Sequence, residues 1–294
     1  MRPATILALA RATATLALLR AADDPPGPRE AGADEPNTYG LPDGEDLADE
    51  LRRWFARQAR AVLGTLPTIG TERPATLPAL TDWDDPMAAA MTPIVGAYWQ
   101  DSGERTRERI GLDPEEWRVS NPHLQRMIHQ QCFEFCASTN RTTSLQLEDA
   151  HRRLREELAS GLVDHGERIP QLTRRVQAVF QHASRSRARR IAQTEASRAV
   201  HAAQLEAARQ SGIVVGLEWL LSGDACPVCQ AIARDVGRVR LGQGFATIGT
   251  NPVYRTIRHP PAHPGCRCSL IEILSSDYGG PTDVAWGAPL RRAA

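Results

Sequence analysis

The residues best able to do chemistry are four cysteines and one histidine in the last third of the chain. Cys226 and Cys229 are two residues apart, a spacing that lets both thiolates bind one tetrahedral metal ion. A second pair of ligands must then come from elsewhere, and His263, Cys266 and Cys268 are available. Five candidate ligands are available for four coordination positions, so either Cys268 or His263 would not bind the metal. The spacing does not decide between these two residues. The pattern predicts a structural zinc site.

Other interpretations of the same cluster stay open. A redox pair at Cys226 and Cys229 is disfavoured because no βαβ unit is predicted around it. A disulfide between the two groups needs an oxidising compartment, which nothing else in the sequence supports. A metal-free, hydrogen-bonded cluster is the main alternative. A catalytic zinc would keep an open position beside a general base such as Asp224, but sites rich in thiolates are usually closed.

Arginines are concentrated just before the cysteines. Between residues 174 and 198 there are seven arginines and one acid, Glu195, which gives a net charge of +6. Guanidinium groups suit phosphate or an acidic protein surface. The candidates for binding double-stranded DNA or an acidic partner are Arg185, Arg187, Arg189 and Arg190. A solvated helix face in an arginine-biased sequence is an equal alternative, and the absence of interleaved aromatic residues argues against single-stranded bases.

The overall composition excludes several classes of protein. The 294 residues include 35 basic and 35 acidic side chains, so a uniformly basic nucleic-acid coat is excluded. Every basic residue is Arg, which removes lysine Schiff-base and P-loop chemistry. No uninterrupted apolar run reaches the roughly 18 residues of a membrane-spanning helix. Arg11 divides the apolar start of the chain, which argues against a cleavable signal. We therefore expect no membrane partner.

Short strands are predicted around the cysteine pairs. Residues 213–221, 235–241 and 268–274 are β-branched or alternating, and they are bounded by Gly and Pro. Cys226 and Cys229 then lie in the turn after the first strand, and the other ligands lead into the third. Metal binding would hold this turn against the start of the last strand.

The remainder of the chain has helical periodicity. Further helices are predicted around residues 87–98 with a kink or break at Pro93, and over 122–137, 142–160, 170–182 and 184–211. Cys132 and Cys136 share one face of the second of these, where buried core thiols are favoured over metal ligands. The fold class is therefore α+β: a mainly α-helical body with a small C-terminal antiparallel β-sheet, stapled by the Cys/His cluster.

An isolated amphipathic helix is predicted from Asp46 onward, after an acidic, Pro- and Gly-rich arm. Its apolar stripe includes Leu47, Leu51, Trp54 and Phe55. A short helix cannot bury such a stripe alone, so it must pack on the protein's own helices or on a partner. The paired aromatics and nearby arginines favour docking on a partner, and packing on the protein's own helices is the alternative.

The order of motifs resembles the phage Mu F-like head morphogenesis family over about residues 122–275. The family has an Arg/Thr-Glu helix, a strand with Trp, an Asp followed by Cys-Pro-x-Cys, and a closing Pro-Pro-x-His-Pro-x-Cys-Arg-Cys. These motifs fall here on Arg190, Thr194, Glu195, Arg198, Trp219, Asp224, Cys226, Pro227, Cys229, Pro260, Pro261, His263, Pro264, Cys266, Arg267 and Cys268. Residue 265 is Gly where the family often has Asn, and both suit a turn.

The resemblance implies a minor head protein of a tailed phage, made in the bacterial cytoplasm during assembly and packaged in the virion. Its implied partners are the portal protein and capsid or scaffold proteins, with double-stranded DNA as an open alternative. We expect an arm over 1–45, a helical docking region over 46–121, the Mu F-like module over 122–275 and a tail over 276–294.

Two other functions compete with this one. Related modules occur fused to ADP-ribosyltransferase domains, so a transferase or a metal-dependent enzyme is one alternative. The sequence lacks paired carboxylates, a phosphate loop and a nucleophile motif, which argues against catalysis. The other alternative is a DNA-binding ejection accessory, whose affinity would fall steeply with salt.

Overall fold

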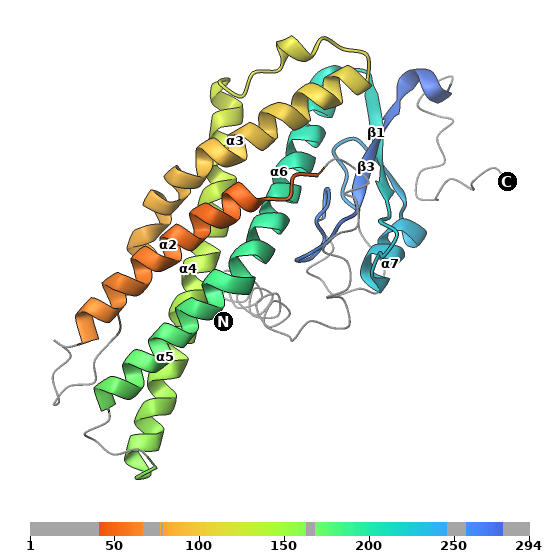
Figure 1. Cartoon of the computed structure of the whole chain (residues 1–294). Helices are drawn as coiled ribbons and strands as arrows, with labels where there is room; N and C mark the ends of the chain where they lie inside the picture. Colours follow the sequence, from red (N-terminus) through yellow and green to blue (C-terminus); the bar gives the residue numbers. More distant parts are fainter. Residues whose placement is uncertain (1–40, 67–76, 78, 163–167, 246–256, 279–294) are drawn as a thin grey trace, which may run out of the picture. The chain divides into compact units, whose positions relative to one another are not determined.

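The computed structural model describes residues 41–66, 77, 79–162, 168–245 and 257–278 (Figure 1). The predicted acidic arm before residue 41 and the predicted tail beyond residue 278 lie outside the described residues. Contacts divide the chain into two compact units. The helical unit comprises 43–99 and 119–199, and the sheet unit comprises 41–42, 100–118 and the described residues from 200 onward. Both units are assembled from separate segments, and the linear division at 45, 121 and 275 stays a prediction.

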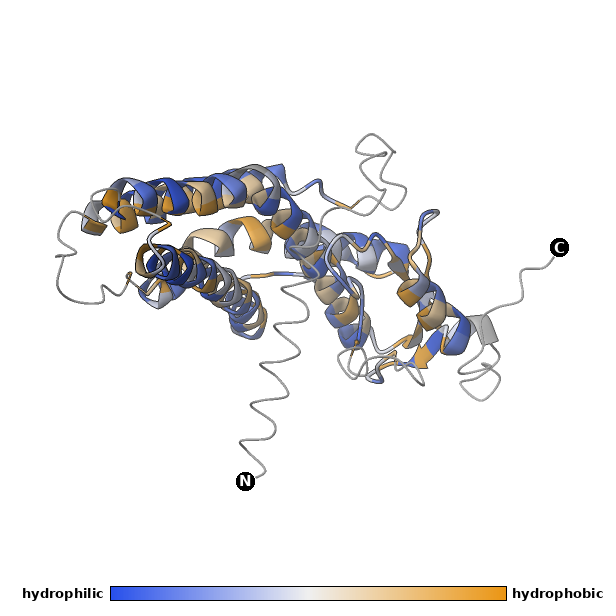
Figure 2. Cartoon of the chain, turned by 90° about the horizontal axis from the view of Figure 1, so that it is seen from below, coloured by the Kyte–Doolittle hydropathy of each residue, from blue (hydrophilic) through white to orange (hydrophobic). Residues whose placement is uncertain are grey.

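The helical unit is built from long helices, a short 3₁₀ turn and one π-helical turn. They are α2 (Glu45–Thr65), η2 (Thr81–Trp83), α3 (Asp84–Arg109) as far as Trp99, α4 (Pro122–Ala159), α5 (Arg168–His182), η5 (Ala183–Arg187) and α6 (Ala188–Ser211) as far as Ala199. Helix α5 packs against α2 and α4. Figure 2 shows hydrophilic and hydrophobic residues interspersed along the described helices.

Helix α2 confirms the predicted amphipathic helix but not its predicted role. Leu47, Leu51 and Phe55 are fully buried and Trp54 is 7% exposed. The apolar stripe therefore packs on the protein's own helices, and it is not a free docking surface. The entry to α2 also shows close packing, because a Cβ on Gly44 (φ 75°) would lie 3.0 Å from the Ala192 backbone carbon.

A buried polar layer connects three helices of this unit. The Gln58 side-chain amide on α2 donates to Asn140 Oδ1 on α4 at 2.7 Å. The Asn140 amide in turn donates to Asp84 Oδ1 at the start of α3, also at 2.7 Å. Because a buried polar group is costly without its partner, these bonds favour one alignment of the three helices.

Two predicted helix breaks do not occur in the described residues. Pro93 lies inside α3, and residues 122–159 form one helix rather than two. In the segment where we expected α4 to stop, Thr142 Oγ1 donates to the Ser138 carbonyl at 2.8 Å and Thr143 Oγ1 to that of Thr139 at 2.9 Å. These hydroxyls bond within the helix instead of forming a turn, so the polar residues do not end it.

The predicted core position of Cys132 and Cys136 is confirmed. Both thiols are fully buried in the helical unit. Burial raises the pKa of Cys132 to about 12 and also raises the pKa of Cys136. They are inert packing residues rather than part of the predicted metal site.

The sheet unit contains a three-stranded antiparallel sheet, which confirms the predicted fold class. Its elements after α6 are β1 (Val214–Leu220), α7 (Pro227–Asp235), β2 (Arg238–Arg240), β3 (Ser269–Leu274) and η7 (Ser275–Tyr278), and η3 (Pro114–Glu116) lies earlier in the chain. The strand order is β2-β1-β3. Trp219 pairs with Leu270, and Leu217 pairs with Val239. Trp219 also packs edge-on against Phe245, with 5.2 Å between ring centroids.

Candidate metal centre

The first cysteine pair opens a helix that the sequence did not predict. Cys226 is the N-cap of α7, Pro227 follows at its first position, and Cys229 lies in the first turn. The Gln230 amide donates to the Cys226 carbonyl at 2.9 Å, closing that turn. We had expected a simple turn here. The helical turn fixes the spacing between the two thiols.

The second group of ligands lies in a tight turn before β3. The Cys266 amide donates to the His263 carbonyl at 3.1 Å. Gly265 has a φ of 73°, in the left-handed region where glycine is favoured. The turn brings His263 and Cys266 toward α7, and Cys268 follows directly before the strand.

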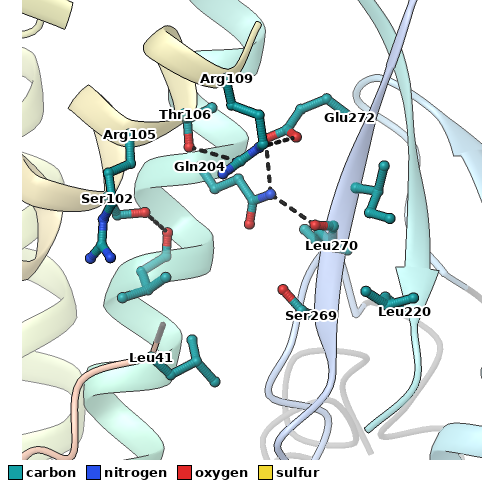
Figure 3. A pocket seen from close by; sticks show the side chains of 12 residues that line it. Leu41, Ser102, Arg105, Thr106, Arg109, Gln204, Leu220, Ser269, Leu270 and Glu272 are labelled. Atoms are coloured by element: carbon teal, nitrogen blue, oxygen red, sulfur yellow. Dashed lines mark hydrogen bonds and ion pairs between the residues drawn. The ribbon is translucent and has the colours of Figure 1, made fainter. Parts of the chain in front are cut away.

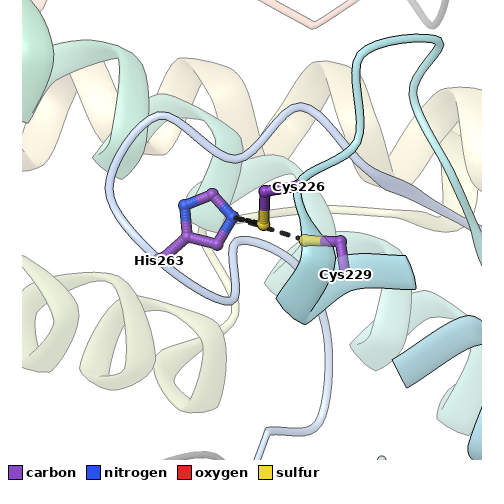
Figure 4. A group of neighbouring side chains, drawn as sticks. All are labelled: Cys226, Cys229 and His263. Carbon is purple, nitrogen blue, oxygen red and sulfur yellow. Dashed lines mark hydrogen bonds between the residues drawn. The ribbon is translucent and has the colours of Figure 1, made fainter. Parts of the chain in front are cut away.

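His263 faces both cysteines of α7 (Figure 4). Its Nε2 atom lies 3.0 Å from Cys226 Sγ and 3.3 Å from Cys229 Sγ. Its Nδ1 atom lies 2.9 Å from the Pro264 carbonyl oxygen. A proton on Nδ1 would satisfy that carbonyl and leave the Nε2 lone pair facing the thiols, which is how metal-binding histidines are commonly oriented.

Cys229 also belongs to a second, fully buried group. Its sulfur lies 3.6 Å from that of Cys266, and the ligand atoms of Cys229, Cys266 and Cys268 are all within 4.8 Å of one another. The structure therefore brings together all five predicted ligand residues, in two groups that share Cys229. Either group has the donors and spacing to hold a metal ion.

The buried thiols strongly perturb one another. Hydrogen bonds with Cys229 and Cys266 lower the pKa of Cys268 to about 2. Hydrogen bonds with Cys266 and Cys268, together with burial, raise the pKa of Cys229. A backbone donor from Ser222 further favours the Cys268 thiolate. A thiolate among buried thiols favours a bound cation, and zinc is a common partner of such donors.

The predicted basic band is only partly available for binding. Arg187 is half-buried, and its guanidinium donates to the Thr143 hydroxyl at 3.1 Å and to the Thr139 carbonyl at 3.2 Å. Arg189 is exposed and pairs with Glu45 at 2.9 Å. Arg190 is partly buried, and the side chain of Arg185 lies outside the described residues. Arg187 thus joins helices within the protein, and DNA contact stays a prediction.

A pocket in the sheet unit, lined by both polar and apolar residues, was not predicted. It has a volume of about 380 Å³. Glu272 on β3 accepts two hydrogen bonds from Arg109, at 2.6 and 3.0 Å, and one from Gln204 at 2.9 Å (Figure 3). The sequence analysis did not single out Glu272, because its partner Arg109 is 163 positions away.

Residues 152–271 match a family described as Phage Mu protein F like protein. The match runs from α4 into β3, and it includes all five candidate ligands. This segment is similar to the Mu F-like family. The resemblance seen in the sequence is thereby confirmed over this range. Comparison with curated proteins and with solved structures gave no match.

The Mu F-like match supports a role of the chain in phage head morphogenesis. The match also supports a minor capsid protein and implies interaction with other phage head components. Among the described helices, none combines the length and apolar character needed to span a membrane.

Proposed function

We propose that this chain is a minor head protein that assembles with the portal of a tailed phage and is packaged in the virion. The Mu F-like match over residues 152–271 is the observation that carries the proposal. The motifs that resemble the family include the Cys/His cluster, so the same segment supports both the assembly role and a metal-stabilised sheet unit.

Zinc is the metal we propose for the cluster. Its ligand preferences fit cysteine and histidine, and thiolates that share a tetrahedral zinc ion lie about 3.8 Å apart. The separation of 3.6 Å between the Cys229 and Cys266 sulfurs fits this value. The role is structural: the ion holds the start of α7 against the segment that leads into β3.

The buried state of the α2 stripe changes where the portal contact is placed. Leu47, Leu51 and Phe55 are core residues, so a partner must use exposed side chains of the chain instead. Removing α2 would expose this core and unfold the helical unit, so such a deletion cannot test docking. Substitutions on the exposed face of a helix can test docking without unfolding the helical unit.

Co-expression with the portal protein encoded by the same phage genome tests the proposal. The full chain, carrying an affinity tag, should retain the portal protein through gel filtration. The tagged major capsid protein, co-expressed with the portal protein in place of this chain, serves as the control. Absence of a stable complex, for a chain whose circular dichroism shows it to be folded, would move the partner from the portal to another head component.

A further inference from the structure

We infer that the Cys/His cluster holds two metal ions, bridged by the thiolate of Cys229, rather than one. The inference rests on the metal binding proposed above and specifies its form. One ion would be bound by Cys226, Cys229 and His263, and the other by Cys229, Cys266 and Cys268.

The separation of the ligand atoms supports two ions. In a single tetrahedral zinc site, all four ligand atoms lie within about 4 Å of one another, because each is only about 2.0–2.3 Å from the metal. Here the three ligand atoms of each group lie within 4.8 Å of one another. Among the described residues, no set of four ligand atoms lies that close together. When two metals share a bridging sulfur, ligands of different metals lie farther apart than ligands of the same metal. The two groups that share Cys229 have this arrangement.

The position of Cys229 fits a bridging ligand. Its sulfur lies 3.3 Å from His263 Nε2 in the first group and 3.6 Å from Cys266 Sγ in the second. It is the one residue common to both groups. Its place in the first turn of α7, next to the loop that precedes β3, gives it contact with both sets.

The charges also favour two ions. The cluster contains four thiols, and Cys229, Cys266 and Cys268 are each at most 5% exposed. Four thiolates and a neutral histidine carry a charge of −4, which two divalent ions balance. One divalent ion balances only two of the four thiolates, so two ions are needed for all four cysteines to be thiolate ligands without a net buried charge.

The two sites differ in their access to solvent. Cys226 and His263 are partly exposed, whereas the second group is buried. Each ion has three protein ligands among the described residues, so each has one further coordination position, and that of the first ion is the more accessible. The first ion should therefore exchange with added metal or chelator before the second.

Metal stoichiometry of the zinc-loaded full chain tests the inference. Native mass spectrometry and elemental analysis should give two zinc ions per chain. Cys226→Ser should remove one, Cys268→Ser should remove one, and Cys229→Ser should remove both. Cys136→Ala, which removes a thiol of the helical unit, should keep two.

Cadmium substitution provides a second readout that does not depend on variants. Two ions that share a sulfur should give two ¹¹³Cd resonances that are coupled to each other. One ion per chain, or a single resonance, would overturn the bridged site and leave the single structural zinc intact. No bound metal under reducing conditions would overturn both. Neither result bears on head assembly, which is measured separately.

Discussion

The Nε2 atom of His263 lies 3.0 Å from the sulfur of Cys226, although 37 positions separate the two residues. This contact holds the beginning of α7 next to the turn that precedes β3. Closing a loop of this length costs conformational entropy, and the metal proposed for this contact would offset that cost. The sheet unit should therefore depend on the metal more than the helical unit does.

Removal of the metal should selectively loosen the sheet unit. Structural zinc contributes on the order of 10 kcal/mol in small metal modules, so Cys226→Ser or a strong chelator should sharply reduce amide protection in β1 and β3. Hydrogen exchange read by mass spectrometry measures this directly, with α4 as the internal reference and Cys136→Ala as the matched control. Unchanged protection of β1 and β3 in metal-free protein would contradict a structural role for the metal.

Glu195 should make the helical unit less stable at neutral pH than in mild acid. It is 7% exposed, and its Oε2 atom has no hydrogen-bond donor among the described residues. Burial raises its pKa, and the opposing effect of Arg198 is smaller. Because the pKa of Glu195 is higher in the folded state than in the unfolded state, its protonated form stabilises the fold fully at pH values below the unfolded-state pKa. This stabilisation is lost as the pH rises through the folded-state pKa.

Glu195→Gln should therefore increase the free energy of unfolding by about 1 kcal/mol at pH 7 and change it little near pH 4. Denaturant unfolding at the two pH values measures the difference. Glu148→Gln, at an exposed position of α4, is the control and should show no such pH dependence. An equal effect of Glu195→Gln at both pH values would show that the carboxylate is adequately solvated.

Loss of Arg109 should leave the buried Glu272 carboxylate without its charged partner. The Glu272 side chain is 4% exposed and accepts two hydrogen bonds from the Arg109 guanidinium, which also donates to Thr106, and one from the neutral Gln204 amide. Arg109→Met should reduce the free energy of unfolding by about 3 kcal/mol, whereas the double variant with Glu272→Leu should recover much of that loss. Thermal unfolding of the four proteins in this cycle measures the coupling. Additive single effects would mean that the ion pair contributes little.

Arg187 should behave as a structural residue and Arg189 as a surface one. Arg187→Gln removes charge-assisted bonds to Thr143 and the Thr139 carbonyl, and it should cost about 1–3 kcal/mol of stability. Arg189→Gln removes an ion pair with Glu45 that is open to solvent, so it should cost less than about 1 kcal/mol. Urea unfolding monitored by circular dichroism separates the two. Equal losses would contradict the distinction between the two residues.

Any DNA binding should then depend on the remaining arginines of the basic band. Replacing Arg189 and Arg190 with Gln should weaken duplex binding and reduce its log–log salt slope by about one unit for each phosphate group that is no longer neutralised. Fluorescence anisotropy across a salt series measures the slope. If the slope does not change, these arginines form a solvated face and the DNA proposal fails.

The sequence was most informative where chemistry depends on local spacing. Cys226 and Cys229 predicted a metal-binding pair, and the motifs around them predicted the family. The helical turn beginning at Cys226 was missed because its nine residues (Pro227–Asp235) are too few for a clear periodic pattern. Glu272 was missed because its partner Arg109 lies on α3, which no local pattern indicates. The role of Trp54 was mistaken because an apolar stripe looks the same whether its partner is the same chain or another.

Quantitative mass spectrometry of purified phage particles tests whether this chain is a minor head protein. We expect intact heads to contain a few copies of the chain per portal ring and to retain them after washing in high salt. Heads that are complete and infectious yet contain none of the chain would contradict its assignment as a minor head protein.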